Sequence, residues 1–210
     1  MIVLYIILFI SLYASIFFLY SYFTHKSAFE TRVDPTFTPE VTVLIPAYNE
    51  ELTLARTLDY VFRMTYPSDK LKVMVVDDGS TDRTYEIAKN YVANQNSNHC
   101  GATVTVYRKE NQGCKAYPVN YGLKKVRTDL VFILDADCMP AKDCLLKLVQ
   151  HMKDEKTMAT ITQIKMYRPR GFLASLQEIE FSISAFIRKN LSFMDSLNIT
   201  PGGALFRKSF

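Results

Sequence analysis

The stretch "LVFILDADCMP", residues 130–140, decides which fold this sequence of 210 residues predicts. Residues 130–134 form an unbroken apolar run, which is typical of a strand buried on both faces of a parallel sheet. Asp135 and Asp137 follow directly, and two carboxylates this close together repel each other. A buried strand that ends in paired acids therefore predicts a polar site at its end, with a positive partner nearby.

The rest of the chain alternates short β-rich runs with amphipathic helical patterns. Strands are expected at 41–45, 71–76, 103–107, 130–134 and 158–164. Helices are expected with Leu54, Leu58, Val61 and Phe62 on one face, from about Thr81 with Ser80 as N-cap, at 116–125 and at 142–153. Strands that alternate with helices form βαβ units, so the sequence predicts an α/β fold with a mostly parallel sheet.

Polar side chains follow four of the predicted strands, at the point where each strand ends. The segments are "PAYNEE" (46–51), "DDGSTD" (77–82), "KENQG" (109–113) and "DADC" (135–138). The carboxyl ends of parallel strands share one edge of the sheet, which is where such folds bind ligands. One cleft is therefore expected to gather Tyr48, Asn49, Glu50, Asp77, Asp78, Asp135 and Asp137.

The first 23 residues contain no charged side chain. A helix of this length crosses about 30 Å of hydrocarbon. A cleaved signal peptide would need basic residues before the apolar run, and a core helix of this length is rarely apolar on every face. The sequence therefore predicts a transmembrane helix at 1–23, a linker at 24–40 and a globular domain at 41–210.

Charge and cysteine usage bound the surroundings of that domain. His25, Lys26 and Arg32 follow the apolar run, so the positive-inside rule predicts a single-pass protein of the cell membrane with its domain in the cytoplasm. The net charge of +4 comes without a dense Lys/Arg block, which argues against nucleic acid as a partner. The four cysteines lack paired C-x-x-C spacing and are expected as reduced thiols. Residues 171–194 predict either a core helix or an amphipathic helix lying against the membrane.

The D-x-D pair after the fourth predicted strand suits a hard divalent cation, Mg²⁺ or Mn²⁺. Such ions take oxygen ligands and keep open positions for phosphate oxygens. The alternative is a strand capped by two solvated aspartates, and the pair alone does not separate the two interpretations.

Four segments, taken together, carry a family resemblance. They are "VTVLIPAYNEE", "VVDDGSTD", "NQGCKAYPVNYGL" and "FILDADCMP". In this order and spacing, over about residues 41–140, the chain resembles the family 2 glycosyltransferases, which include cellulose, chitin and hyaluronan synthases. The resemblance implies a GT-A fold with a Rossmann-like sheet, and inversion at the anomeric carbon. It also implies a nucleotide-diphosphate sugar donor, with a UDP-sugar favoured, and a polysaccharide or lipid-linked acceptor.

The resemblance further implies which residues bind the donor. Pro46, Tyr48 and Glu50 match the family's "P-x-Y-N-E" segment, in which the aromatic ring lies against the nucleobase. Asp78 matches the carboxylate expected at the uridine, and Lys115 matches a lysine near the diphosphate.

Metal and acceptor positions follow from the same resemblance. Asp135 matches an aspartate that contacts both donor and metal, and Asp137 matches the metal ligand. The segment "TPGGALFRKSF", residues 200–210, is similar to a glycine-rich turn on the acceptor side, where Gly202 and Gly203 allow a sugar to approach closely.

Two motifs of the family do not occur in this sequence. The general base, the Asp of a Thr-Glu-Asp or equivalent motif, is expected beyond Phe210, and so is the Q-x-x-R-W motif of processive members. The domain is therefore expected to be incomplete, and a chain that binds a nucleotide sugar without turnover is an alternative. A D-x-D phosphatase of the haloacid-dehalogenase type is a weaker one, because Met139 stands where Thr or Val is usual and the aspartates follow the fourth strand, not the first.

Overall fold

A computed structural model describes residues 1–29, 31–98, 103–194 and 202–208. The chain divides into a helical unit, residues 1–31 and 163–198, and a sheet unit, residues 32–162 and 199–210. The sheet unit contains the motifs that carry the family resemblance, so the candidate site belongs to this unit.

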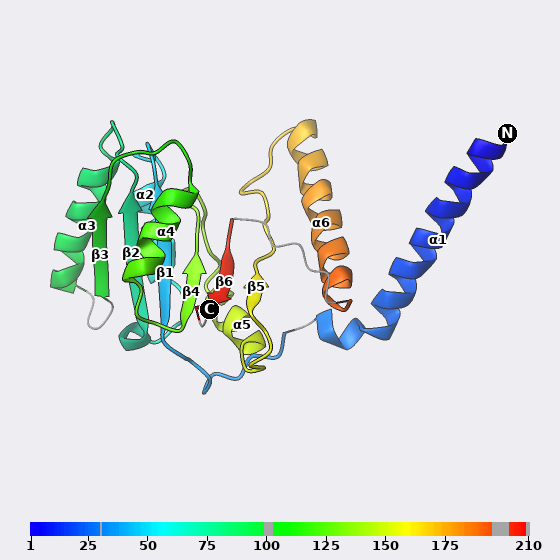
Figure 1. The fold of residues 1–210 in the computed structure, drawn as a ribbon, viewed down its shortest axis with the longest axis horizontal. Helices are drawn as coiled ribbons and strands as arrows, with labels where there is room; N and C mark the ends of the chain where they lie inside the picture. Colours follow the sequence, from blue (N-terminus) through cyan, green and yellow to red (C-terminus); the bar gives the residue numbers. More distant parts are fainter. Residues whose placement is uncertain (30, 99–102, 195–201, 209–210) are drawn as a thin grey trace. The chain divides into compact units, whose positions relative to one another are not determined.

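The described part of the sheet unit has six strands in the order β3-β2-β1-β4-β6-β5 (Figure 1). Neighbouring strands among β3, β2, β1 and β4 pair in parallel, whereas β6 runs antiparallel to β4 and β5. The predicted α/β fold with a mostly parallel sheet is therefore confirmed. The strands are β1 Val41–Ala47, β2 Leu71–Asp77, β3 Thr103–Arg108, β4 Leu130–Ile133, β5 Ala159–Ile161 and β6 Ala204–Arg207.

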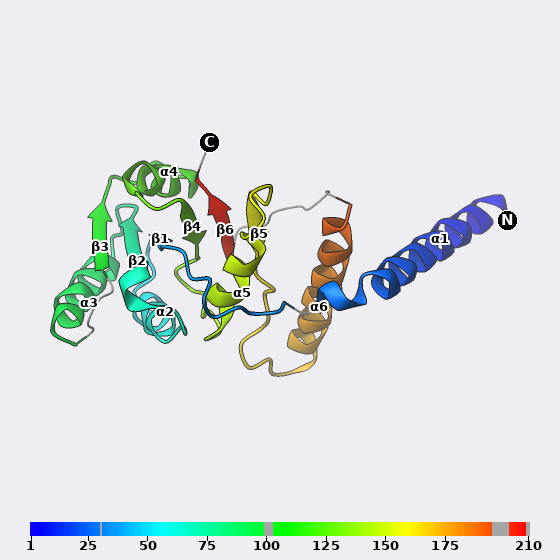
Figure 2. The ribbon, with the colours of Figure 1, turned by 90° about the horizontal axis from the view of Figure 1, so that it is seen from below.

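Helices cover both faces of this sheet, which is why every residue of β1 is buried (Figure 2). One face packs on α2 Leu54–Phe62, α3 Thr84–Asn98 and α5 Cys144–His151, and the other packs on α4 Ala116–Lys125. A Cβ atom added to Gly122 of α4 would lie 2.4 Å from Leu44 Cδ1 of β1. Glycine at this position therefore lets α4 approach the centre of the sheet.

The start of α3 differs from the prediction. The helix begins at Thr84 and not near Thr81, and Ser80 is not its N-cap. The carboxylate of Asp82 accepts a hydrogen bond from Thr84 N at 2.9 Å, while Ser80 Oγ accepts one from Asn49 N at 3.0 Å. A serine that bonds to a neighbouring loop is not available to cap the helix, so the prediction of Ser80 as N-cap was wrong.

Strand β6 was not predicted. Residues 200–210 were expected as a turn, yet Ala204–Arg207 is inserted between β4 and β5. Leu205 of this strand is fully buried. Because β5 pairs with β6, the second edge of the sheet depends on this short segment.

Part of the predicted linker is docked on the sheet unit. The Lys153 Nζ atom lies 2.7 Å from Asp34 Oδ2, and Asp34 N donates to Gln150 Oε1 at 3.2 Å. The hydrogen bonds from Lys153 and Thr36 hold the pKa of Asp34 well below its usual range. Residues 32–40 therefore belong to the sheet unit, where Asp34 has partners on α5 and just after it.

The helical unit contains α1 Ile2–Thr24, the short 3-10 helix η1 Lys26–Phe29, and α6 Phe172–Ser192. Helix α1 is the one described helix that is long and apolar enough to cross a membrane, with a mean hydropathy of 2.7. The Phe186 ring of α6 contacts the rings of Phe18 and Tyr22 of α1, with centroids 6.4 and 5.9 Å apart. Leu176, Ile179 and Ile183 are exposed in the described chain, so α6 is not buried in an apolar core there.

Candidate active site

A cleft of about 490 Å³ opens at the carboxyl ends of the parallel strands. Its position agrees with the general rule for open α/β sheets, because the loops after β1, β2 and β4 all reach it. The lining residues are Pro46, Ala47, Tyr48, Glu50, Asp78, Asn111, Gly113, Cys114, Lys115, Pro118, Asp135, Ala136 and Asp137.

All residues predicted to bind donor or metal line this single cleft: Pro46, Tyr48, Glu50, Asp78, Lys115, Asp135 and Asp137. Asn49 and Asp77, which were expected to join them, are not among the lining residues. Sequence position alone did not distinguish these two residues from their neighbours.

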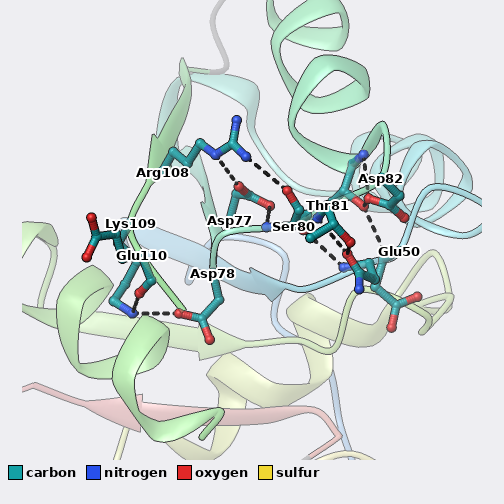
Figure 3. A network of polar contacts seen from close by, with 11 residues as sticks. Glu50, Asp77, Asp78, Ser80, Thr81, Asp82, Arg108, Lys109 and Glu110 are labelled. Atoms are coloured by element: carbon teal, nitrogen blue, oxygen red, sulfur yellow. Dashed lines mark hydrogen bonds and ion pairs between the residues drawn. The ribbon is translucent and has the colours of Figure 1, made fainter. Parts of the chain in front are cut away.

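Asp77 and Asp78 point to opposite sides at the end of β2, because successive side chains of an extended strand alternate (Figure 3). Asp77 is fully buried, and its Oδ1 accepts a hydrogen bond from Ser80 N at 3.3 Å. Its Oδ2 lies 3.2 Å from Arg108 Nε, a contact that is not aligned as a hydrogen bond. Arg108 also donates to Ser80 O at 2.9 Å. Asp77 therefore stabilises the β2–α3 turn and does not face a ligand.

Asp78 faces the cleft and is held from one side by a lysine. The Lys109 Nζ atom lies 2.6 Å from Asp78 Oδ1, and both side chains are mostly buried (Figure 3). Lys109 Nζ also donates to the Glu110 carbonyl at 2.5 Å, so it is attached at two points. Lys109 contacts Oδ1 of Asp78, so Oδ2 is the carboxylate oxygen that can accept a hydrogen bond from a ligand.

Asn49 connects the loops after β1 and β2. Its φ of 54° lies in the left-handed region, which asparagine tolerates better than most residues. Asn49 N donates to Ser80 Oγ at 3.0 Å, and its Oδ1 accepts a bond from Thr81 N at 2.9 Å. The next residue, Glu50, donates its N–H to Thr84 Oγ1 at 2.7 Å. Asn49 thus has a structural role that positions Tyr48 and Glu50.

Asp135, Asp137 and Cys138 form a group whose potential ligand atoms lie within 4.8 Å of one another. Burial, followed by the charges of Asp137 and Asp135, raises the pKa of the Cys138 thiol to about 12. A thiol sulfur is a soft ligand that suits a hard cation poorly, whereas the two carboxylates fit Mg²⁺ or Mn²⁺. Lys115 forms an ion pair with Asp135 Oδ1 from across the cleft.

Gly202 and Gly203 lie at the same edge of the sheet without lining the cleft. The register pairs Ala204 with Ile133, so the two glycines continue past the end of β4 toward the level of Asp135. Gly203 has a φ of 149°, and an added Cβ would lie 2.4 Å from Thr162 Oγ1. Close packing of β5 against β6 therefore explains glycine at position 203, whatever its role toward an acceptor.

Sequence reasoning missed several contributions from the segment between β3 and α4 and from the first turn of α4. Asn111, Cys114 and Pro118 line the cleft, and Lys109 holds Asp78. Their position after the third predicted strand was a usable signal, since "KENQG" was expected at this edge. The partner of each lysine was not deducible, because it depends on how the loop folds over the sheet.

Comparisons with known proteins agree with this geometry. A family model described as glycosyl transferase family 2 matches residues 42–210. A poly-beta-1,6-N-acetyl-D-glucosamine synthase of Staphylococcus aureus is 28% identical over 208 residues, covering 96% of this chain and 48% of the relative. The probable glycosyltransferase YdaM of Bacillus subtilis is 33% identical over 129 residues, covering 61% of this chain and 30% of the relative. The chain thus spans about half the length, or less, of these curated relatives.

Solved structures give the same answer for the fold. A mannosyltransferase of Pyrobaculum calidifontis, solved with GDP-Man and Mn²⁺, superposes with a TM-score of 0.67 at 27% identity, covering 94% of this chain and 55% of that one. TarS of S. aureus, solved with UDP-GlcNAc, superposes with a TM-score of 0.54 at 25% identity, covering 63% of this chain and 36% of that one. Because the family model matches most of the chain and its fold is that of such enzymes, the chain belongs to glycosyl transferase family 2.

Proposed function

We propose that this chain is the donor-binding part of an inverting glycosyltransferase that moves a sugar from a UDP-sugar to a polysaccharide or lipid-linked acceptor. The observation that carries the proposal is the cleft in which Asp78, Lys115, Asp135 and Asp137 converge at the carboxyl edge of the sheet. A relative named as a polysaccharide synthase, similar over 96% of this chain, supports the class of acceptor. The neighbour solved with UDP-GlcNAc supports a UDP-sugar as donor.

The nucleoside would bind between the ends of β1 and β2. Tyr48 is 48% exposed and offers its ring to a base. Asp78 is oriented by Lys109, and its Oδ2 would accept an N–H of uracil. Pro46, Ala47 and Glu50 also line this part of the cleft.

The diphosphate would bind between Lys115 and the two aspartates of the D-x-D pair. Asp137 and Asp135 would hold a divalent cation, which supplies positive charge where the leaving diphosphate becomes more negative. Lys115, which lines the same cleft and pairs with Asp135, would supply a second positive charge. Both aspartates lie in the loop directly after β4, a buried strand that fixes where this loop begins.

The acceptor would approach from the side of β6. Gly202 and Gly203 directly precede β6, the strand that pairs with β4, and the register places them near the level of Asp135. We further propose that α1 anchors the protein in the cell membrane with the sheet unit in the cytoplasm.

Donor binding is tested on the full chain in detergent micelles by thermal unfolding with UDP-GlcNAc and Mn²⁺. A ligand at about a hundredfold excess over its Kd stabilises by about 2.7 kcal/mol, which raises Tm by roughly 5–10 °C. We expect this rise in the wild type and in Asp129→Asn, which changes an exposed aspartate at the amino end of β4, away from the cleft. We do not expect it in Asp137→Asn. Equal protection of Asp137→Asn would contradict the proposed metal site.

Turnover is tested with the same three proteins, by release of UDP from UDP-GlcNAc in the presence of an oligosaccharide acceptor. Where the wild type releases UDP, we expect Asp137→Asn to lose at least about a hundredfold in rate. Donor protection without product would assign this chain to the class that binds nucleotide sugars without turnover. Release of phosphate from simple phosphomonoesters, without donor protection, would favour the phosphatase alternative instead.

A further inference from the structure

The segment between β3 and α4 provides the positive partners of two acidic groups in the cleft. Lys109 pairs with Asp78, and Lys115 pairs with Asp135. The two lysines differ in how firmly they are held. The Lys109 side chain is 13% exposed and has a second acceptor in Glu110 O, whereas the Lys115 side chain is 48% exposed and has only Asp135 as a described polar partner. Lys115 is therefore the lysine that is free to exchange its partner.

We propose that Lys115 occupies the place of the metal cation at Asp135 in the donor-free cleft, and that it transfers to the diphosphate when metal and donor bind together. This inference rests on the proposed function, since it assumes a nucleoside diphosphate as ligand. Its consequence is that metal and nucleotide each bind weakly alone and strengthen each other, with Lys115 as the residue that couples them.

The charges at the end of β4 support this coupling. Asp135, Asp137 and Lys115 together carry one net negative charge. A divalent cation alone would leave one net positive charge beside Lys115, and a doubly negative nucleotide sugar alone would leave three negative charges. When both bind, the group returns to one negative charge. Like charges close together disfavour both the state with the cation alone and the state with the nucleotide alone, so binding of the two together is favoured.

The position of Lys115 allows the exchange. It directly precedes α4, whose N-terminal end lines the cleft through Cys114, Lys115 and Pro118. The positive end of a helix favours a phosphate at this point, so the released ammonium group and the helix would act on the same anion. A half-exposed ion pair contributes little in water, which keeps the exchange from Asp135 easy.

The coupling is measured on the full chain in detergent micelles, using electron paramagnetic resonance to follow free Mn²⁺ with and without UDP. In the wild type we expect UDP to tighten Mn²⁺ binding by about tenfold or more, which corresponds to about 1.4 kcal/mol. Lys115→Gln should bind Mn²⁺ alone about threefold to tenfold more tightly than the wild type, and the factor by which UDP tightens Mn²⁺ binding should be smaller than in the wild type by at least about threefold. Lys124→Gln removes an exposed lysine from the other end of the same helix and should behave as the wild type.

Two results would overturn the inference. One is Mn²⁺ affinity without UDP that is equal to or weaker than wild type in Lys115→Gln, with circular dichroism showing that the variant is folded. The other is tighter binding of Mn²⁺ alone by Lys115→Arg than by the wild type. This variant keeps the charge, and a guanidinium also pairs with Asp135, so we expect it to bind Mn²⁺ alone no more tightly than the wild type. If the proposed function fails, the wild type binds neither UDP nor GDP, yet the Mn²⁺ comparison between these variants still tests the place of Lys115.

Discussion

Arg108→Ala should destabilise the sheet unit although its side chain is half exposed. Asp77 is fully buried, and Arg108 is the cation that faces its Oδ2 at 3.2 Å. Removing one partner of a fully buried ion pair costs about 3–5 kcal/mol. Because the Arg108 side chain is 49% exposed, water replaces part of the lost interaction. We therefore expect a loss of about 1–3 kcal/mol, which is below the range for a fully buried pair.

Thermal unfolding of the full chain in detergent checks this value. A domain of roughly 150 residues loses about 2–4 °C of Tm per kcal/mol, so Arg108→Ala should lower Tm by about 2–12 °C. Arg83→Ala is the matched control, because Arg83 is 76% exposed and lies 3.4 Å from Glu51, where the cost should stay below about 1 kcal/mol. The double variant Asp77→Asn/Arg108→Ala should lose less than the sum of the single changes. A Tm for Arg108→Ala as high as that of the control would refute the argument.

Three further predictions follow from the geometry. Gly203→Ala should cost about 2–3 kcal/mol by thermal unfolding, because the backbone strain at a φ of 149° adds to the clash of the new Cβ, 2.4 Å from Thr162 Oγ1. Gly113→Ala, with a φ of 76° and open space around the added Cβ, should cost about 1 kcal/mol, and equal losses would contradict the packing argument. Burial raises the pKa of Cys144 to about 11, so its alkylation by iodoacetamide should rise about tenfold per pH unit between pH 8 and 10. At pH 8 mass spectrometry should find Cys144 modified at least about a hundredfold more slowly than the exposed Cys114, and comparable rates would contradict the shift. UDP with Mn²⁺ should slow the alkylation of Cys114, which lines the cleft, and leave Cys144 unchanged; no protection of Cys114 would show that the nucleotide does not occupy this wall.

The parallel strands and the donor side of the cleft were predictable because their signals are local. An apolar run such as residues 130–134 has to be buried, and acids directly after it have to lie at its end. The same logic located Tyr48, Asp78 and Asp137 at one edge. The strand pattern did not separate Asp77 from Asp78, because both lie at the end of the same strand. The family resemblance favoured Asp78, and the directions of the two side chains assign Asp77 to the turn and Asp78 to the cleft.

Sequence by itself determined the apolar N-terminal helix, the βαβ order and the acidic edge, since hydrophobic periodicity and strand ends are encoded within a few neighbouring residues. Only the tertiary structure decided that Ala204–Arg207 enters the sheet between β4 and β5, because strand pairing over some seventy residues depends on burial of Leu205 and not on local propensity. It also decided which lysine meets which aspartate. Both lysines lie in the loop between β3 and α4, and the way this loop folds over the sheet brings Lys109 to Asp78 and Lys115 to Asp135. No spacing in the sequence specifies that path.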